Sequence, residues 1–383
     1  MKVSDAKIRK ILNSRGEWGI ELELKVNGNW FRASVPAGKS RGKYEAVQLR
    51  AEESIKRFSA FKNEILGEYG DFREFDAHLI KIAGERKEKF GVDLVLAASI
   101  AFFRAQGNVW EVLGTTPSLP TPMLNLINGG KHAGNWLSVQ EFLIVPLHLH
   151  TFREKMEASA EIYKALREFL LKKYGRGSIN VGDEGGFAPP LKTTSEAIEL
   201  LERAVEEVGY GGDVRLSLDM AATSYFDGDY SIDGLKLARG AYIDYVLELV
   251  KEYRLFSVED PLHEDDWEGF AQITKKSRIM VVGDDLLVTN PQRVRKAIEM
   301  KACNAVLVKP NQIGTVTETL EVIELAKKSG WNYIISHRSG ETTDTFISHL
   351  AFGIGAPFIK AGAPCRGERT AKYNELLRLE ELI

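Results

Sequence analysis

The stretch LFSVEDP, residues 255–261, decides the fold, because apolar side chains fill three of its first four positions and Glu259 and Asp260 follow. The apolar run drives the segment into a core, where a carboxylate without a partner is costly. The same pattern, a short apolar run that ends in an ionisable side chain, recurs along the chain. These runs end at Asp219, at Asp284 and Asp285, at Lys309, at His337 and at Lys360.

From Glu259 onward these run ends recur about every 25 residues, which fits one strand, one helix and their loops. The spacing therefore indicates successive βα units. In a barrel built of such units, polar residues at the carboxyl ends of the strands share one mouth. We therefore predict an α/β fold in which Asp219, Glu259 and Asp284 converge.

Converging carboxylates repel one another by about 4 kcal/mol per close pair at an intermediate dielectric, so a positive group is expected between them. Ligation by oxygen alone favours Mg²⁺ over zinc, which prefers His or Cys. For any single acid, a helix N-cap that faces solvent explains the pattern equally well. Three acids in successive units, followed by Lys, His and Lys, favour a metal site.

The composition is that of an ordinary globular enzyme, with 383 residues, 44% hydrophobic and 27% charged side chains. A formal net charge of −3 gives no basic surface for nucleic acid or for an anionic membrane. The two cysteines are too few for a disulfide framework and fit a reducing compartment. The longest apolar run, 94–103, is too short to span a bilayer, and the charge-rich start resembles no signal peptide, so we expect a cytoplasmic protein.

The N-terminal part begins with a predicted hairpin. Apolar and charged residues alternate from Ile20 to Val26, Asn27 and Gly28 form the turn, and residues 30–35 return. Helical spacing follows over 44–61, 72–83 and 92–106, and a proline-rich segment at 115–122 marks a boundary. We therefore predict a small α+β capping domain at 1–117 and a β/α barrel at 118–383.

Two glycine-rich loops carry further candidate residues. MLNLINGGKHAG, residues 123–134, places His132 between glycines, and VQEFLIVP places Glu141 just before an apolar run. INVGDEGGFAPP, residues 179–190, places Asp183 and Glu184 at another strand end. Paired glycines allow the backbone to approach a ligand closely, although they also mark tight turns. Because the acids lie between glycines, we favour a ligand-binding loop over a plain turn.

These motifs together resemble the enolase family, from about Leu12 to the C-terminus. They are NGGKHAGN, QEF, GDEGGFAP, SVEDPLHEDDW, GDDLLVTN, KPNQIGT, SHRSGETTD and IKAGAPCRGERTAKYNELLRLEEL. The resemblance implies a capping domain on an irregular, TIM-like barrel with an antiparallel second strand. It also implies a lyase, phosphopyruvate hydratase, which catalyses the reversible Mg²⁺-dependent dehydration of 2-phosphoglycerate to phosphoenolpyruvate in glycolysis and gluconeogenesis.

The resemblance also implies the roles of individual residues. Lys309 would be the base, with a pKa lowered by Mg²⁺ and Lys360, and Glu184 the general acid beside Glu141, in a pair that keeps one proton. His132 would close over the substrate. Two Mg²⁺ ions are expected per site. The substrate ligands would be Lys360, His337, Arg338 and Ser339, and the metal ligands Asp219, Glu259, Asp284 and, for the second ion, Ser40.

The lid motif departs from the family pattern. It reads PAGKSRG where enolases usually have PSGASTG, so Lys39 and Arg41 flank Ser40. Two alternatives to an enolase therefore stay open. One is a paralogue that abstracts the same proton from another phosphorylated or anionic acid, and the other is a non-catalytic binding protein on the same fold. The family also leads us to expect a homodimer or a higher homo-oligomer.

Overall fold

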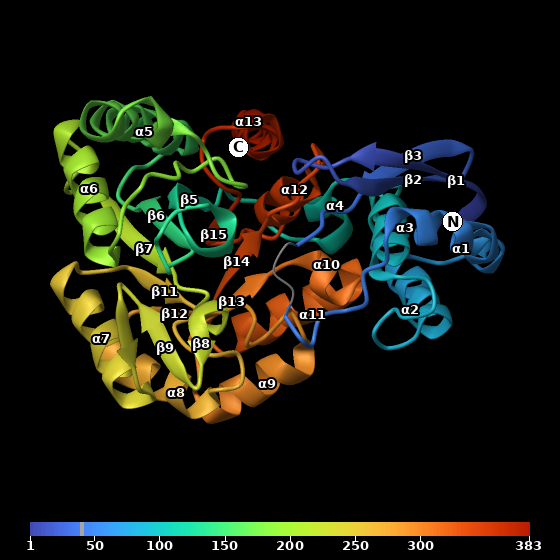
Figure 1. Ribbon diagram of the computed structural model, residues 1–383. Helices are drawn as coiled ribbons and strands as arrows, with labels where there is room; N and C mark the ends of the chain where they lie inside the picture. Colours follow the sequence, from blue (N-terminus) through green and yellow to red (C-terminus); the bar gives the residue numbers. More distant parts are fainter. Residues whose placement is uncertain (39–41) are drawn as a thin grey trace.

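The computed structural model describes residues 1–38 and 42–383, in which a small N-terminal α+β domain lies beside a closed barrel (Figure 1). The predicted hairpin is confirmed, because Asn27 and Gly28 both adopt positive φ and the apolar side chains from Ile20 to Val26 are buried. Residues 2–12 add a strand that the sequence did not indicate. The sheet order is β3-β2-β1-β4, formed by β1 (Lys2–Leu12), β2 (Trp18–Val26), β3 (Asn29–Ser34) and β4 (Gly67–Glu68).

The helices of this domain pack on one another and on the sheet. The prediction of a helix from Tyr44 was wrong over 44–50, since these residues form no helix and bond to other segments, as the amide of Ala46 does to the carbonyl of Gln312. The apolar run at 94–103 lies in a buried helix between the sheet and the barrel. The helices are α1 (Ala51–Ile65), α2 (Phe72–Ala83), α3 (Val92–Arg104) and α4 (Val109–Leu113).

The barrel is irregular, as the resemblance implied. Its order is β11-β12-β13-β14-β15-β5-β6-β7, and β6 runs antiparallel to both of its neighbours. The predicted α/β fold with a TIM-like barrel is confirmed. The strands are β5 (Thr121–Asn128), β6 (Glu141–Pro146), β7 (Val214–Asp219), β11 (Ser257–Glu259), β12 (Met280–Gly283), β13 (Ala305–Val308), β14 (Asn332–Ser336) and β15 (Phe358–Lys360).

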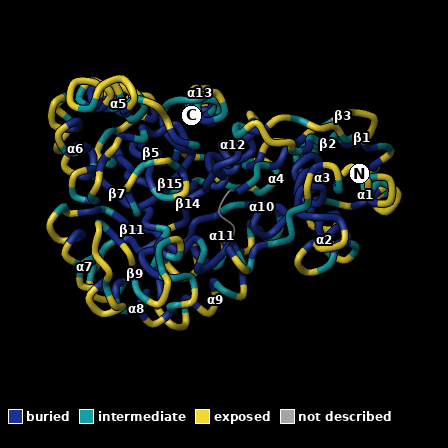
Figure 2. Tube along the Cα trace, viewed as in Figure 1, coloured by how far each residue is buried: buried dark blue, intermediate teal, exposed yellow. Residues whose placement is uncertain are grey.

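Helices surround the barrel and leave its strands buried, so the exposed surface in Figure 2 follows the outer helices. They are α5 (Phe152–Tyr174), α6 (Thr194–Glu207), α7 (Arg239–Glu252), α8 (Trp267–Ser277), α9 (Pro291–Met300), α10 (Pro310–Ile313), α11 (Val316–Lys328), α12 (Phe346–Gly353) and α13 (Gly367–Glu380). Smaller elements are η1 (Gly130–His132), η2 (Arg176–Ile179), η3 (Ala222–Tyr225) and a sheet of β8 (Phe226–Asp227), β9 (Asp229–Ile232) and β10 (Leu235–Leu237). Within the described ranges, no helix combines the length and apolarity needed to cross a bilayer.

A compact apolar cluster fills the part of the barrel interior that precedes the carboxyl ends of the parallel strands. Residues of six of the eight strands contribute to it, all but β7 and β11, and they alternate along a strand because successive side chains point to opposite faces. On β13, for example, Ala305 and Leu307 belong to this inner cluster, whereas Val306 and Val308 join the core beneath the helices. The inner cluster consists of Met123, Leu143, Val145, Met280, Val282, Ala305, Leu307, Ile334 and Phe358.

Candidate active site

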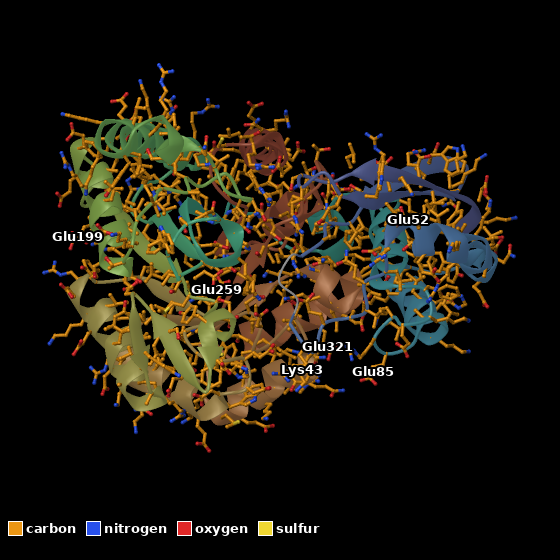
Figure 3. All side chains as sticks on the ribbon, viewed as in Figure 1. Lys43, Glu52, Glu85, Glu199, Glu259 and Glu321 are labelled. Carbon is orange, nitrogen blue, oxygen red and sulfur yellow. The ribbon has the colours of Figure 1, made fainter. Side chains whose placement is uncertain are left out.

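The same alternation places ionisable side chains above the apolar cluster. Asp284, Lys309 and Lys360 lie two residues beyond Val282, Leu307 and Phe358, and all three line one cavity. Asp219 and Glu259 lie in register at the carboxyl ends of β7 and β11. Because β6 is antiparallel, its first residue, Glu141, pairs with Asp219 at this same end. Glu259 lies centrally among the barrel elements in Figure 3.

Lys360 lies among the acids of this cavity. Its Nζ is 2.9 Å from both carboxylate oxygens of Glu259, 3.2 Å from Oδ2 of Asp219 and 3.1 Å from Oε2 of Glu141. Burial opposes the charge on Lys360, but the three carboxylates outweigh it and raise its pKa well above the usual value. Burial, followed by the charge of Asp219, raises the pKa of Glu259 to about 8. The positive charge of Lys360 therefore does not offset all of the negative charge around it.

Lys309 donates to Oδ2 of Asp284 at 2.5 Å. Burial favours the neutral amine, yet Asp284 outweighs burial and raises the pKa of Lys309. The prediction that the pKa of Lys309 is lowered is therefore wrong for the protein without Mg²⁺. Lys360 does lower this pKa, as expected, but Asp284 raises it by more. The other oxygen of Asp284 accepts from Nε2 of Gln312 at 3.0 Å, and the amide of Lys309 donates to Oγ1 of Thr289 at 2.9 Å. Neighbouring side chains thus hold the carboxylate of Asp284 and the backbone of Lys309 in place.

Glu184 is buried between two histidines. Its Oε1 is 3.5 Å from Nδ1 of His132 and 3.4 Å from Nε2 of His337, and its Oε2 accepts from Nδ2 of Asn125 at 3.0 Å. Nδ1 of His132 is also 3.6 Å from Oε1 of Glu141. The structure thus brings both predicted carboxylates and the glycine-loop histidine together.

The two glutamates differ in acidity. Burial and then the charge of Glu184 raise the pKa of Glu141 well above its usual range. Burial would raise the pKa of Glu184 too, but His132, His337 and Arg369 hold it well below. Burial also lowers the pKa of His132, and that of His337 to about 4, so both imidazoles are neutral at neutral pH. Of the two carboxyl groups, Glu141 therefore binds a proton more tightly than Glu184.

Arg338 and Ser339 also line the cavity and are buried. Arg338 is held by Glu45 of the N-terminal domain, through Nη1 to Oε2 at 2.9 Å and Nη2 to Oε1 at 3.1 Å. Gly38 packs directly on this guanidinium, where a Cβ atom would lie 1.9 Å from Nη2. Ser40, with Lys39 and Arg41, falls outside the described residues.

The charge balance of the cavity suits a cation. Its lining includes six carboxylates but three cationic side chains. In the described parts of the chain, two groups of three ligand residues have atoms within 4.8 Å of one another, His132 with Glu141 and Glu184, and Asp260 with Asp284 and Asp285. The predicted trio of Asp219, Glu259 and Asp284 is not among them. Lys360 contacts Asp219 and Glu259, and Lys309 contacts Asp284.

Several residues of the site were not predicted from the sequence. Gln140 donates to Oδ2 of Asp219 at 3.1 Å, and Asp260, at a positive φ, accepts from the amides of Asp284 and Asp285. Gln140 and Asp260 could have been found because each adjoins a predicted site residue, Glu141 or Glu259. No sequence pattern marks Glu45 or Asn125, because each reaches the site only when the chain folds.

Comparisons with known proteins agree with this geometry. The family model of the enolase C-terminal TIM barrel domain matches residues 116–383, and that of the enolase N-terminal domain matches residues 3–113. Among similar proteins, an enolase of Methanocaldococcus jannaschii is 45% identical, with 99% of this chain and 95% of that protein covered. Enolases of Thermococcus kodakarensis and Solanum lycopersicum are each 41% identical at the same coverage. The chain therefore belongs to the enolase family.

Proposed function

We propose that the protein is a lyase, phosphopyruvate hydratase, that reversibly dehydrates 2-phosphoglycerate to phosphoenolpyruvate. Family membership supports this reaction. The observation that carries it is a single cavity that is lined both by a lysine, Lys309, and by a buried glutamate, Glu184. Elimination of water from a 3-hydroxy acid needs a base at the carbon beside the carboxylate and an acid at the departing hydroxyl.

The proposed base is Lys309, which would take the proton from the carbon next to the substrate carboxylate. It must first lose its own proton, and Asp284 opposes this loss. Any cation that takes Asp284 as a ligand would withdraw that carboxylate's charge from the lysine. Lys360 would offset the substrate carboxylate, because its ammonium lies at the acidic centre of the cavity.

The proposed acid is Glu184, which would protonate the hydroxyl as the carbon–oxygen bond breaks. Glu141 binds a proton more tightly than Glu184, and Nδ1 of His132 faces an oxygen of each glutamate. We therefore assign His132 to proton exchange between them. Arg338 and Ser339 would bind the phosphate, for which a guanidinium fork is suited, and His337 would complete that side of the cavity.

Mg²⁺ fits the donor set, because the lining carboxylates exceed the cations and Glu259 retains a pKa of about 8 beside Lys360. We propose two ions per site, the first held by Asp219, Glu259 and Asp284 and the second by Ser40. Bound there, Mg²⁺ would supply positive charge to the substrate carboxylate. Family membership also supports cytoplasmic glycolysis, a small phosphorylated acid as the ligand, and a homodimer or higher homo-oligomer.

Formation of phosphoenolpyruvate from 2-phosphoglycerate, with Mg²⁺ and then with a chelator, tests the proposal. We expect activity with Mg²⁺ alone and a fall of about 10²–10⁴-fold in Lys309→Ala and Glu184→Gln. Lys276→Ala, in an exposed lysine of α8, is the control and should retain the wild-type rate. Wild-type turnover no faster than that of Lys309→Ala would refute the proposal, and a clear preference for another acid would favour the paralogue.

A further inference from the structure

Arg369 lies in the first turn of α13 and is completely buried behind the barrel mouth. Its Nη1 lies 2.6 Å from Nδ1 of His337 and donates to the carbonyl of Arg338 at 2.7 Å. Its Nη2 donates to the carbonyls of Asp183 at 3.0 Å and Ser339 at 2.7 Å. One guanidinium therefore joins the loop of the proposed acid to the loop of the proposed phosphate ligands.

The contact with His337 fixes where that imidazole carries its proton. A guanidinium only donates hydrogen bonds, so Nδ1 of His337 must accept through its lone pair. A neutral imidazole has one N–H, which is then on Nε2, the atom that faces Oε1 of Glu184 at 3.4 Å. A proton on Nδ1 would instead point at the N–H of a permanent cation, which costs both a hydrogen bond and Coulomb energy.

His132 is placed differently. Its Nδ1 faces both Glu141 and Glu184 at 3.6 and 3.5 Å, and among the described residues no hydrogen-bond donor occupies this atom. The two histidines that face Glu184 are therefore unequal. One has its Nδ1 occupied by an arginine, and the other has its Nδ1 open to two carboxyl groups.

We propose that Arg369 is a positioning residue that fixes His337 as a neutral Nε2–H donor toward Glu184, and that proton exchange with Glu184 thereby falls to His132. The arginine acts through the imidazole and is not itself one of the residues that line the cavity. This inference deepens the proposed function and rests on it for the role of Glu184. The proton position of His337 is a property of the free protein and can be measured without substrate.

Nitrogen NMR of protein labelled at its histidines tests the proposal at neutral pH. The chain has seven histidines, and the signals absent from His337→Gln identify those of His337. We expect Nδ1 of His337 to show the shift of an unprotonated, accepting nitrogen and Nε2 that of an N–H. A wild-type spectrum with the proton on Nδ1, or with both nitrogens protonated, would overturn the proposal whether or not any variant folds.

Arg369→Met shows whether the arginine imposes this tautomer. We expect a mixture of tautomers in Arg369→Met, and also in Arg369→Gln, whose amide ends short of His337. Arg366→Met is the matched control, because Arg366 also joins this loop region, through the carbonyls of Gly182 and Ser14, without contacting His337. A folded Arg369 variant that keeps the wild-type tautomer would overturn the positioning role. These spectra keep their meaning even if 2-phosphoglycerate is not the substrate.

Discussion

Glu45 and Arg338 form a buried, two-pronged ion pair that joins the N-terminal domain to the barrel mouth. Oε1 of Glu45 also accepts from the amide of Gly42 at 2.9 Å. The carboxylate of Glu45 therefore connects Gly42 to Arg338, the arginine proposed to bind phosphate. Arg338 is oriented from the other domain, so the cavity is complete only when both domains are in place.

Glu45→Ala should destabilise the protein and weaken substrate binding. The change leaves a buried guanidinium without its carboxylate, which typically costs about 3–5 kcal/mol of unfolding free energy. We also expect a higher KM for 2-phosphoglycerate, because Arg338 loses its fixed orientation. Urea unfolding and steady-state kinetics measure the two effects. Glu52→Ala is the control, since Glu52 belongs to an exposed pair with Lys10 on the same domain (Figure 3) and should change neither.

The barrel and its ionisable centre were predictable because apolar runs that end in an ionisable side chain recur about every 25 residues. Each apolar run, followed for two further residues, predicts a side chain that points into the mouth, and this holds for Asp284 and Lys309. The sequence also showed which strand ends carry an acid and which carry a lysine. The ionisable residues of the site could therefore be predicted from the sequence pattern, and the family motifs supplied their proposed roles.

The partners of these residues were not predictable, because they come from distant parts of the chain. Glu45 reaches Arg338 across 293 residues, and no local pattern marks such a pair. The absence of a helix over 44–50 has the same cause, since the amides of Ala46 and Val47 bond to the distant carbonyls of Gln312 and Arg86. Charge balance was likewise invisible, so the raised pKa of Lys309 appeared only once Asp284 lay beside it.

Asp76→Asn should change how stability depends on pH. Asp76 is completely buried where α2 meets α11, and it accepts two hydrogen bonds from Thr317. Burial raises its pKa from the ordinary value of 3.8 to about 6. Between these pH values the folded protein retains a proton that the unfolded chain has lost, so the wild type loses unfolding free energy as pH rises.

Between about pH 4 and 6 the wild type loses about 3 kcal/mol of unfolding free energy, and this loss is complete above pH 6. The asparagine variant carries no such proton. We therefore expect the unfolding free energy of Asp76→Asn, relative to wild type, to rise between about pH 4 and 6 and then to level off. Denaturant unfolding at several pH values measures it. A difference that is constant across this range would contradict the assignment.

Mg²⁺ should stabilise the protein through the predicted acids. A ligand that binds the folded state at about 100 times its Kd adds about 2.7 kcal/mol of stability, which raises the melting temperature. Glu259→Gln removes one proposed ligand and should reduce the rise. Glu199→Gln, on the outer helix α6 (Figure 3), is the control and should leave the rise intact. An equal rise in Glu259→Gln and wild type would place the ion elsewhere.

Lys360→Met and Glu259→Gln should be strongly non-additive in stability. Removal of Lys360 alone leaves Glu141, Asp219 and Glu259 without the ammonium that contacts all three, and removal of Glu259 alone leaves the lysine with fewer partners. In the double variant one unpaired carboxylate is gone, so the combined loss of unfolding free energy should be smaller than the sum by about 0.5–3 kcal/mol. Activity should not recover, because the substrate carboxylate still lacks its counter-charge. Denaturant unfolding of the four proteins gives the coupling, and additive losses would show that Lys360 and Glu259 do not compensate each other's charge.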